Sequence, residues 1–173
     1  MRKILIAGAI LASLPAIAQT ISQTIPQAAK TPFTSVERLT AENAVRHLTG
    51  QELGDTMKKG MTPGAFYSQM LLSKHDGYQI INTIRDKDGQ AEIHADWNDN
   101  LFVQEGEATF VTGGAAVDAK ISAPGEQRGT AIKGGKATTM RVGDYFFVPA
   151  GTPHQMKVGA GQRIRFIAFK THK

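Results

Sequence analysis

Hydrophobic and polar residues follow three different patterns along the chain. Residues 4–18 are almost uninterruptedly apolar, and residues 34–60 place apolar side chains at roughly helical spacing. From residue 65 onward, short apolar or alternating runs are separated by Gly, Pro and Asp-Gly pairs. Spacing near 3.6 residues predicts a helix, whereas alternation and frequent turn residues predict strands. We therefore expect a helical segment over 34–64 and an all-β domain over 65–173.

The expected strands are short and numerous. They cover residues 65–72, 78–85, 91–95, 100–104, 108–112, 145–148, 154–158 and 163–170, with strand-like pieces near 115–121, 128–133 and 137–142. Asp76-Gly77 between the first two strands is typical of a hairpin turn. Many short strands with frequent Gly and Pro turns are typical of a β-sandwich or a β-barrel.

The start of the helical segment carries a capping signal. Thr34 and Glu37 have the spacing of a capping box, in which each side chain satisfies a backbone N–H of the first turn. Three glycines, at positions 50, 54 and 60, are expected to interrupt the helix because Gly is a poor helix former.

The beginning of the chain has the pattern of a signal peptide over residues 1–18. Arg2 and Lys3 precede an apolar run of 15 residues, and Ala16-Ile17-Ala18 is a small-x-small cleavage site before Gln19. The run is shorter than the ~20 residues that cross a membrane comfortably, although an uncleaved anchor is the alternative. We expect a periplasmic or secreted protein with no membrane attachment after cleavage.

Composition limits the remaining classes of protein. The 173 residues suit one domain, and the Thr-, Gln- and Pro-rich stretch 19–33 is expected to be a flexible linker. The chain has no Cys, which excludes thiol catalysis, thiolate metal ligands and disulfides. The formal charge of +5 falls to +3 when Arg2 and Lys3 leave with the signal peptide, so we expect no nucleic-acid partner.

Two passages place polar residues of metal-binding type inside the β region. In the first, Glu92 and His94 share one face of a strand, and Asp99 and Gly106 follow them. In the second, residues 143–154 place Gly143, Pro149 and Gly151 before His154, so that a tight reversal feeds a new strand.

These passages resemble the two sequence motifs of the cupin family, over roughly residues 65–170. The second matches the pattern Gly, five residues, Pro, one residue, Gly, two residues, His, and it ends on His154. The first fits in its spacing if His94 takes the place of the second family His, Glu92 that of the first His, and Asp99 that of the Glu. A second registration, in which His94 is the first His and Asp96 the second, shortens the loop before Asp99 by two residues.

The resemblance implies an all-β fold, a cupin double-stranded β-barrel that is jelly-roll-like, with the helical segment at its N-terminal side. It also implies a metal site made of Glu92, His94, Asp99 and His154. Two imidazoles and two carboxylates suit a divalent transition metal, namely Mn, Fe, Ni or Zn. The alternative is a hydrogen-bonded polar cluster in a metal-free barrel.

The function stays open at this point, because one fold hosts many activities. A metal-dependent enzyme, a non-catalytic barrel that binds a small organic ligand, and a structural or partner-binding module are all compatible with the sequence, and no catalytic residue is assigned. Residues 107–142 are expected to add a hairpin at one end of the barrel, where it would shape a ligand mouth or the contact of a homodimer. Glu126 and Arg128 in this stretch are expected to form a surface ion pair of little consequence.

Overall fold

The structure is a computed structural model that describes residues 34–38 and 45–173. The predicted signal peptide (1–18) and linker (19–33) lie outside the described residues. No helix within the described ranges is both long and apolar enough to cross a membrane.

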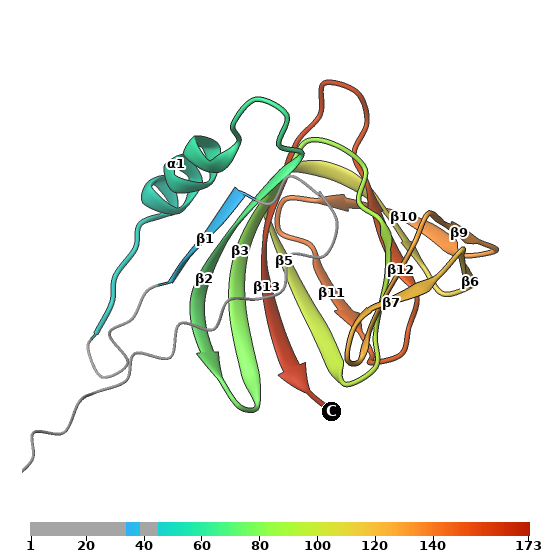
Figure 1. Ribbon diagram of the computed structural model, residues 1–173. Coiled ribbons are helices and arrows are strands. Elements are labelled where there is room, and N and C mark those ends of the chain that lie inside the picture. Colours follow the sequence, from blue (N-terminus) through green and yellow to red (C-terminus); the bar gives the residue numbers. More distant parts are fainter. Residues whose placement is uncertain (1–33, 39–44) are drawn as a thin grey trace, which may run out of the picture.

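Strands dominate the described part of the chain (Figure 1). In chain order the elements are β1 (Thr34–Arg38), α1 (Gly50–Gly60), β2 (Tyr67–His75), β3 (Tyr78–Arg85), β4 (Ala91–His94), β5 (Trp97–Thr112), β6 (Ala115–Val117), β7 (Lys120–Ala123), β8 (Glu126–Gly129), β9 (Ala131–Lys133), β10 (Lys136–Arg141), β11 (Tyr145–Val148), β12 (His154–Lys157) and β13 (Ile164–His172). The predicted all-β fold with one helical segment before it is confirmed.

The long strand β5 joins two sheets that curl around a common interior (Figure 1). Its first part pairs with β13 and β11, in a sheet that continues through β3 and β2 to β1. Its last part pairs with β10 and β12, in a sheet that continues through β4 and β8 to β7. All of these pairs are antiparallel except the parallel pair of β1 with β2. The result is a curled half-barrel, which agrees with the predicted jelly-roll-like β-barrel.

Gly106 marks the corner at which β5 passes from one sheet to the other. Its φ is +70°, and a Cβ there would overlap the carbonyl oxygen of Arg163. The pairing of β5 with β13 shifts register beside this point, between Arg165 and Phe166. Only Gly combines a positive φ with so close an approach of backbone. The two strands predicted at 100–104 and 108–112 are therefore one bent strand.

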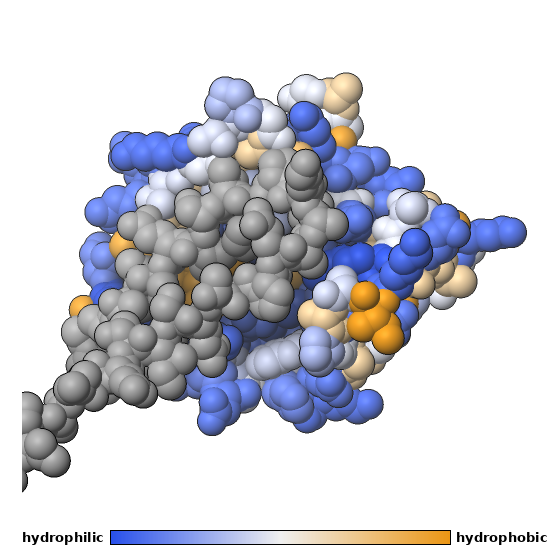
Figure 2. Space-filling view, in the orientation of Figure 1, coloured by the Kyte–Doolittle hydropathy of each residue, from blue (hydrophilic) through white to orange (hydrophobic). Residues whose placement is uncertain are grey.

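Apolar side chains fill the space between the sheets and a second space outside them. The interior cluster contains Leu101, Val103, Ala108, Phe110, Met140, Val148, Met156, Val158, Ile164, Phe166 and Ala168. The outer cluster consists of Met57 from α1 with Met70 and Ile84, from β2 and β3. Because side chains alternate along a strand, β2 and β3 can face the helix and the interior at once. On the face in Figure 2, hydrophilic side chains predominate among the described residues.

The helix begins later than the sequence pattern predicted. Residues 34–38 form a strand and not a first helical turn, so the capping box expected at Thr34 is wrong. The capping box is instead Thr49 with Glu52, whose carboxylate accepts a hydrogen bond from the Thr49 backbone N–H at 2.7 Å. Of the three glycines, Gly50 and Gly60 are the first and last residues of the helix, and Gly54 lies within it without interrupting it. At Gly60 a Cβ would overlap Ser68 of β2, so a missing side chain allows the helix to lie close to the sheet.

The stretch 107–142 adds more than the single hairpin expected. Strands β6 and β9 form a separate two-stranded sheet, and β7 and β8 form a hairpin. Strand β8 pairs with β4 and so joins the main sheet beside the first motif. This pairing brings residues of the added hairpin to the site described next.

Candidate metal centre

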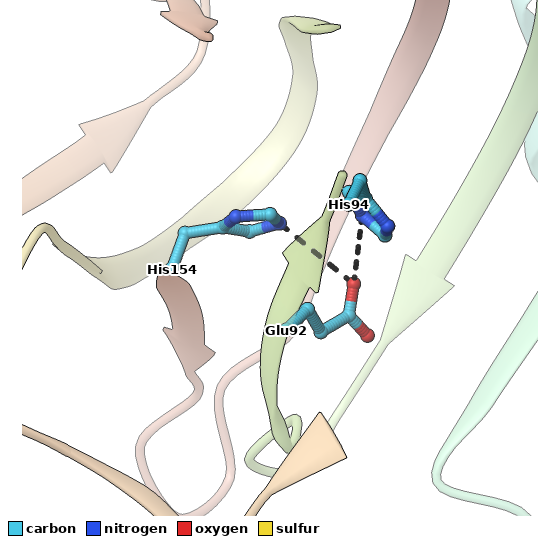
Figure 3. Close-up of side chains that lie close together, drawn as sticks. All are labelled: Glu92, His94 and His154. Carbon is cyan, nitrogen blue, oxygen red and sulfur yellow. Dashed lines mark ion pairs between the residues drawn. The ribbon is translucent and has the colours of Figure 1, made fainter. Parts of the chain in front are cut away.

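Three strands bring the four predicted ligands together. Glu92 and His94 alternate on β4 and face the interior, and β4 pairs with β12 so that Glu92 lies opposite His154. Asp99 comes from β5. Figure 3 shows the Glu92 carboxylate between the imidazoles of His94 and His154. Both imidazoles and Asp99 are buried, with about one twentieth of each residue exposed (4%, 5% and 5%).

Three of the four predicted ligands, Glu92, His94 and His154, have ligand atoms close enough together for one small cation; Asp99 is not part of this group, although it lies near both imidazoles. The Nε2 atom of His94 is 3.5 Å from Glu92 Oε2 and 3.4 Å from Asp99 Oδ2, and the Nε2 atom of His154 is 3.8 Å and 3.6 Å from the same two oxygens. Ligands with bonds of about 2.1 Å around a tetrahedral ion are roughly 3.4 Å apart. The Glu92–His94–His154 group, whose ligand atoms all lie within 4.8 Å of one another, could therefore hold a metal.

The other nitrogen of each imidazole is held by an acceptor. His94 Nδ1 lies 2.6 Å from Glu126 Oε2, and His154 Nδ1 lies 3.0 Å from the carbonyl oxygen of Thr152. Each Nδ1 therefore carries a proton and donates it, which leaves Nε2 as the nitrogen that faces the carboxylates. Hydrogen bonds of this kind orient the His ligands of metal sites and fix their tautomer.

Charge and burial act differently on the two imidazoles. Burial lowers the pKa of His94, but hydrogen bonds with the carboxylates of Asp99, Glu126 and Glu92 outweigh it and raise that pKa to about 10. Burial lowers the pKa of His154, and the neighbouring carboxylates do not restore it. The His94 Nε2 atom is buried and faces the carboxylate oxygens of Asp99 and Glu92, at 3.4 Å and 3.5 Å. A metal ion would have to replace the proton that this nitrogen carries at neutral pH.

Comparisons with known proteins bear on the fold. No family profile matches the sequence, and neither does any curated protein. A protein of Klebsiella pneumoniae with a double-stranded β-helix domain matches the structure with a TM-score of 0.53 and 12% identity, over 74% of this chain and 90% of that chain. This chain has the cupin fold.

Two further cupin structures are similar, at lower scores. The cupin domain of Cnp3 from Schizosaccharomyces pombe has a TM-score of 0.47 and 9% identity, over 62% of this chain and 65% of that chain. A cupin-2 domain protein of Rhodospirillum rubrum has a TM-score of 0.45 and 12% identity, over 61% and 60%. The chain thus spans less than two thirds of the length of each of these two.

The geometry distinguishes the two registrations of the first cupin motif. Both registrations include Asp99, and they differ in whether Glu92 or Asp96 joins it: the Glu92 carboxylate lies beside both imidazoles, whereas Asp96 is exposed in the bend between β4 and β5. The registration with Glu92, His94 and Asp99 therefore fits the barrel better. That these residues and His154 bind a metal stays a prediction.

Glu126 and Arg128 belong to this cluster, and the expectation of an unimportant surface pair is wrong. They alternate on β8, whose pairing places Glu126 opposite His94 and Arg128 opposite Glu92. Arg128 Nη1 lies 3.0 Å from Glu126 Oε2, and its Nε lies 3.8 Å from Glu92 Oε1. The side chains are partly buried: that of Arg128 is 30% exposed and that of Glu126 is 23% exposed. Their spacing of two residues was the only signal in the sequence, because the pairing of β8 with β4 is not local.

Lys170 is a further residue that the sequence reasoning missed. It lies opposite Asp99 in the pairing of β13 with β5, and its Nζ is 2.5 Å from Asp99 Oδ1. Burial raises the pKa of Asp99, but hydrogen bonding to His94 and the charge of Lys170 more than offset this and lower it. One oxygen of Asp99 is thus held by a lysine while the other faces the imidazoles.

The cluster forms part of the wall of a cavity of about 670 Å³ inside the cupin barrel. This volume lies within the range of small-molecule sites. The polar wall holds the cluster, and an apolar wall is formed by Phe66, Ile81, Leu101, Phe110, Met156 and Phe166. A small organic molecule could therefore contact the candidate metal site and apolar surface at once.

Proposed function

We propose that this protein binds a divalent transition metal through Glu92, His94, Asp99 and His154, and a small organic ligand in the cavity beside it. The observation that supports the metal most directly is the orientation of the two imidazoles. Each has Nδ1 held by an acceptor and Nε2 turned toward the same two carboxylate oxygens. Mn, Fe, Ni and Zn all accept such ligands.

The protein's own residues would prepare the site in distinct ways. Glu126 would accept a hydrogen bond from His94 Nδ1 and so turn Nε2 toward the ion, and Lys170 would direct one oxygen of Asp99. When bound, the ion would supply a Lewis acid at the cavity wall.

We also propose that the protein acts outside the cytoplasm, in the periplasm or after secretion. Support comes from Arg2 and Lys3, the apolar run after them and the Ala16-Ile17-Ala18 site. The mature chain would then begin at Gln19, and this is the chain to use in the metal analysis.

Elemental analysis of that chain, purified without chelator or affinity-tag metal, tests the metal proposal. About one equivalent of one transition metal is expected, lost in His154→Ala with the β-sheet circular dichroism unchanged. Glu92→Gln should lose most of the metal, and the matched control Asp96→Asn should keep it because Asp96 is exposed.

Two outcomes would contradict the metal proposal. The first is no metal even after reconstitution at neutral pH, which would favour a metal-free ligand-binding barrel. The second is a metal content that survives His154→Ala, which would mean that the ion lies elsewhere.

A further inference from the structure

A buried arginine with an unused donor lies in the wall of the same cavity. Arg85, the last residue of β3, is 9% exposed, and its side chain lines the cavity. Among the described residues its buried Nη1 atom has no hydrogen-bond partner, and no carboxylate forms an ion pair with the side chain. An arginine that is this deeply buried normally meets an acceptor or an anion.

The surroundings hold the Arg85 guanidinium in place without supplying an acceptor. Its Cζ lies 5.1 Å from the ring centroid of Tyr67 and 5.9 Å from that of Phe66. On the other side, a Cβ at Gly89 would approach Nη1 to 2.9 Å, so glycine leaves the room that the guanidinium occupies. Aromatic faces attract a cation but accept little hydrogen bonding. The N–H groups therefore remain available to a ligand in the cavity.

Among the cations of the cavity wall, Arg85 is the one that forms no ion pair with a described carboxylate. Three carboxylates line the cavity, those of Glu92, Asp99 and Glu126, and three cationic side chains, Arg85, Arg128 and Lys170. The carboxylates contact Arg128, Lys170 and the imidazoles, and none forms an ion pair with Arg85. A bound divalent ion would add further positive charge. The three carboxylates and the three cations balance in number, so the preference for an anion comes from Arg85 itself.

We propose that Arg85 is the anion-binding group of the cavity, and that the ligand is a small organic carboxylate. Its carboxylate would accept a hydrogen bond from Arg85 Nη1, and its apolar body would lie against Leu101, Phe110 and Phe166. The proposal rests on the cavity ligand proposed above but not on the metal. An inorganic anion would satisfy Arg85 and leave the apolar wall uncovered, so an organic anion fits the whole cavity better.

Calorimetric titration with three probes tests this in the chelator-treated and in the metal-loaded protein. Benzoate carries both parts of the proposed ligand, benzamide lacks the charge, and acetate lacks the apolar body. Charge-assisted hydrogen bonds contribute about 1.5–3 kcal/mol, so benzoate should bind roughly ten- to hundredfold more tightly than benzamide. Acetate should bind more weakly than benzoate as well.

Variants of Arg85 then assign the effect to this side chain. Arg85→Met should lower benzoate affinity at least about tenfold and benzamide affinity by less, because the benzamide carbonyl oxygen accepts the same hydrogen bond without carrying a charge. Arg85→Lys should keep part of the preference for benzoate. The matched control is Arg141→Met, because Arg141 is an arginine of β10 that is exposed.

Several results would overturn the proposal: no binding of benzoate at millimolar concentration, equal affinity for benzoate and benzamide, or unchanged benzoate affinity in Arg85→Met. Acetate or inorganic phosphate binding as tightly as benzoate would overturn the organic class. If Arg85→Met does not fold, the ratio of benzoate affinity to benzamide affinity, measured in the wild-type protein and in Arg85→Lys, tests the proposal. Binding of benzoate by the chelator-treated protein supports the proposal even where the metal analysis fails.

Discussion

Metal binding at this site should release one proton from His94. In the metal-free protein, burial lowers the pKa of His94 but the surrounding carboxylates raise it to about 10, so its Nε2 carries a proton at neutral pH. The pKa of His154 is lowered by burial, so its Nε2 is already free. A metal ion must therefore displace the His94 proton, and it displaces no proton from His154.

The size of the effect on metal affinity follows from the difference between the pH of the experiment and the pKa of His94. At pH 7, about three pH units below a pKa of about 10, the proton weakens the apparent metal affinity about a thousandfold. The apparent affinity should rise about tenfold for each pH unit between pH 6 and pH 8. The carboxylates add no slope there, because the pKa values of Glu92 and Asp99 are lowered from their ordinary values.

The same proton affects the stability of the metal-free fold. A pKa raised above the ordinary value of about 6.5 contributes stability that is complete below pH ~6.5 and is lost as the pH rises through about 10. The free energy of unfolding should therefore fall by roughly 1.4 kcal/mol for each pH unit across this window. His94→Gln should remove this part of the pH dependence.

Isothermal titration calorimetry with Zn²⁺ measures the proton count. Titrations at pH 7 in two buffers of different ionisation enthalpy should show that one proton is released for each ion bound. The matched control is His75→Gln, which should release the same number because His75 is an exposed histidine. Zero protons released, together with an affinity that does not change between pH 6 and pH 8, would refute the reasoning, because His94 Nε2 would then be free in the metal-free protein.

Two further predictions concern Lys170 and the helix. Lys170→Met frees the second oxygen of Asp99 and removes a positive charge beside the site. The affinity for Zn²⁺, measured by calorimetry, should therefore rise at least about tenfold. Weaker binding would mean that Lys170 chiefly holds Asp99 in position. Met57→Ala removes a side chain that lies between α1 and the sheet and is 1% exposed. It should lower the free energy of unfolding, measured in urea, by about 2–5 kcal/mol and leave the Zn²⁺ affinity unchanged. A loss under about 1 kcal/mol would contradict the packing of the helix on the sheet.

The strands of the barrel were largely predictable because their signals are local. Alternation and turn residues predicted most strands within a few residues, and the same alternation put Glu92 and His94 on one face of β4. The spacing of the second motif placed His154 at the start of β12, where the structure has it. The Gly106 corner was not predicted as a bend within one strand, because a bulge shows itself only when the partner strand is known.

The helix shows how a local signal can mislead. The capping box predicted at Thr34 is not formed, and the one that caps the helix, at Thr49, was not predicted. Residues 34–38 instead pair with β2, a strand about thirty residues further along the chain. Glycines that weaken an isolated helix are tolerated at positions 54 and 60 because they let the helix approach the sheet closely.

By itself the sequence determined the fold class, one face of β4 and the position of His154, since each of these depends on spacing within a few residues. Only the tertiary structure decided that Glu126 holds His94, that Lys170 contacts Asp99, and that Arg85 faces the same cavity. These contacts join strands that are distant in sequence, and their partners depend on sheet order and register. The charges that meet in the cavity therefore depend on the tertiary structure and could not be predicted from the sequence.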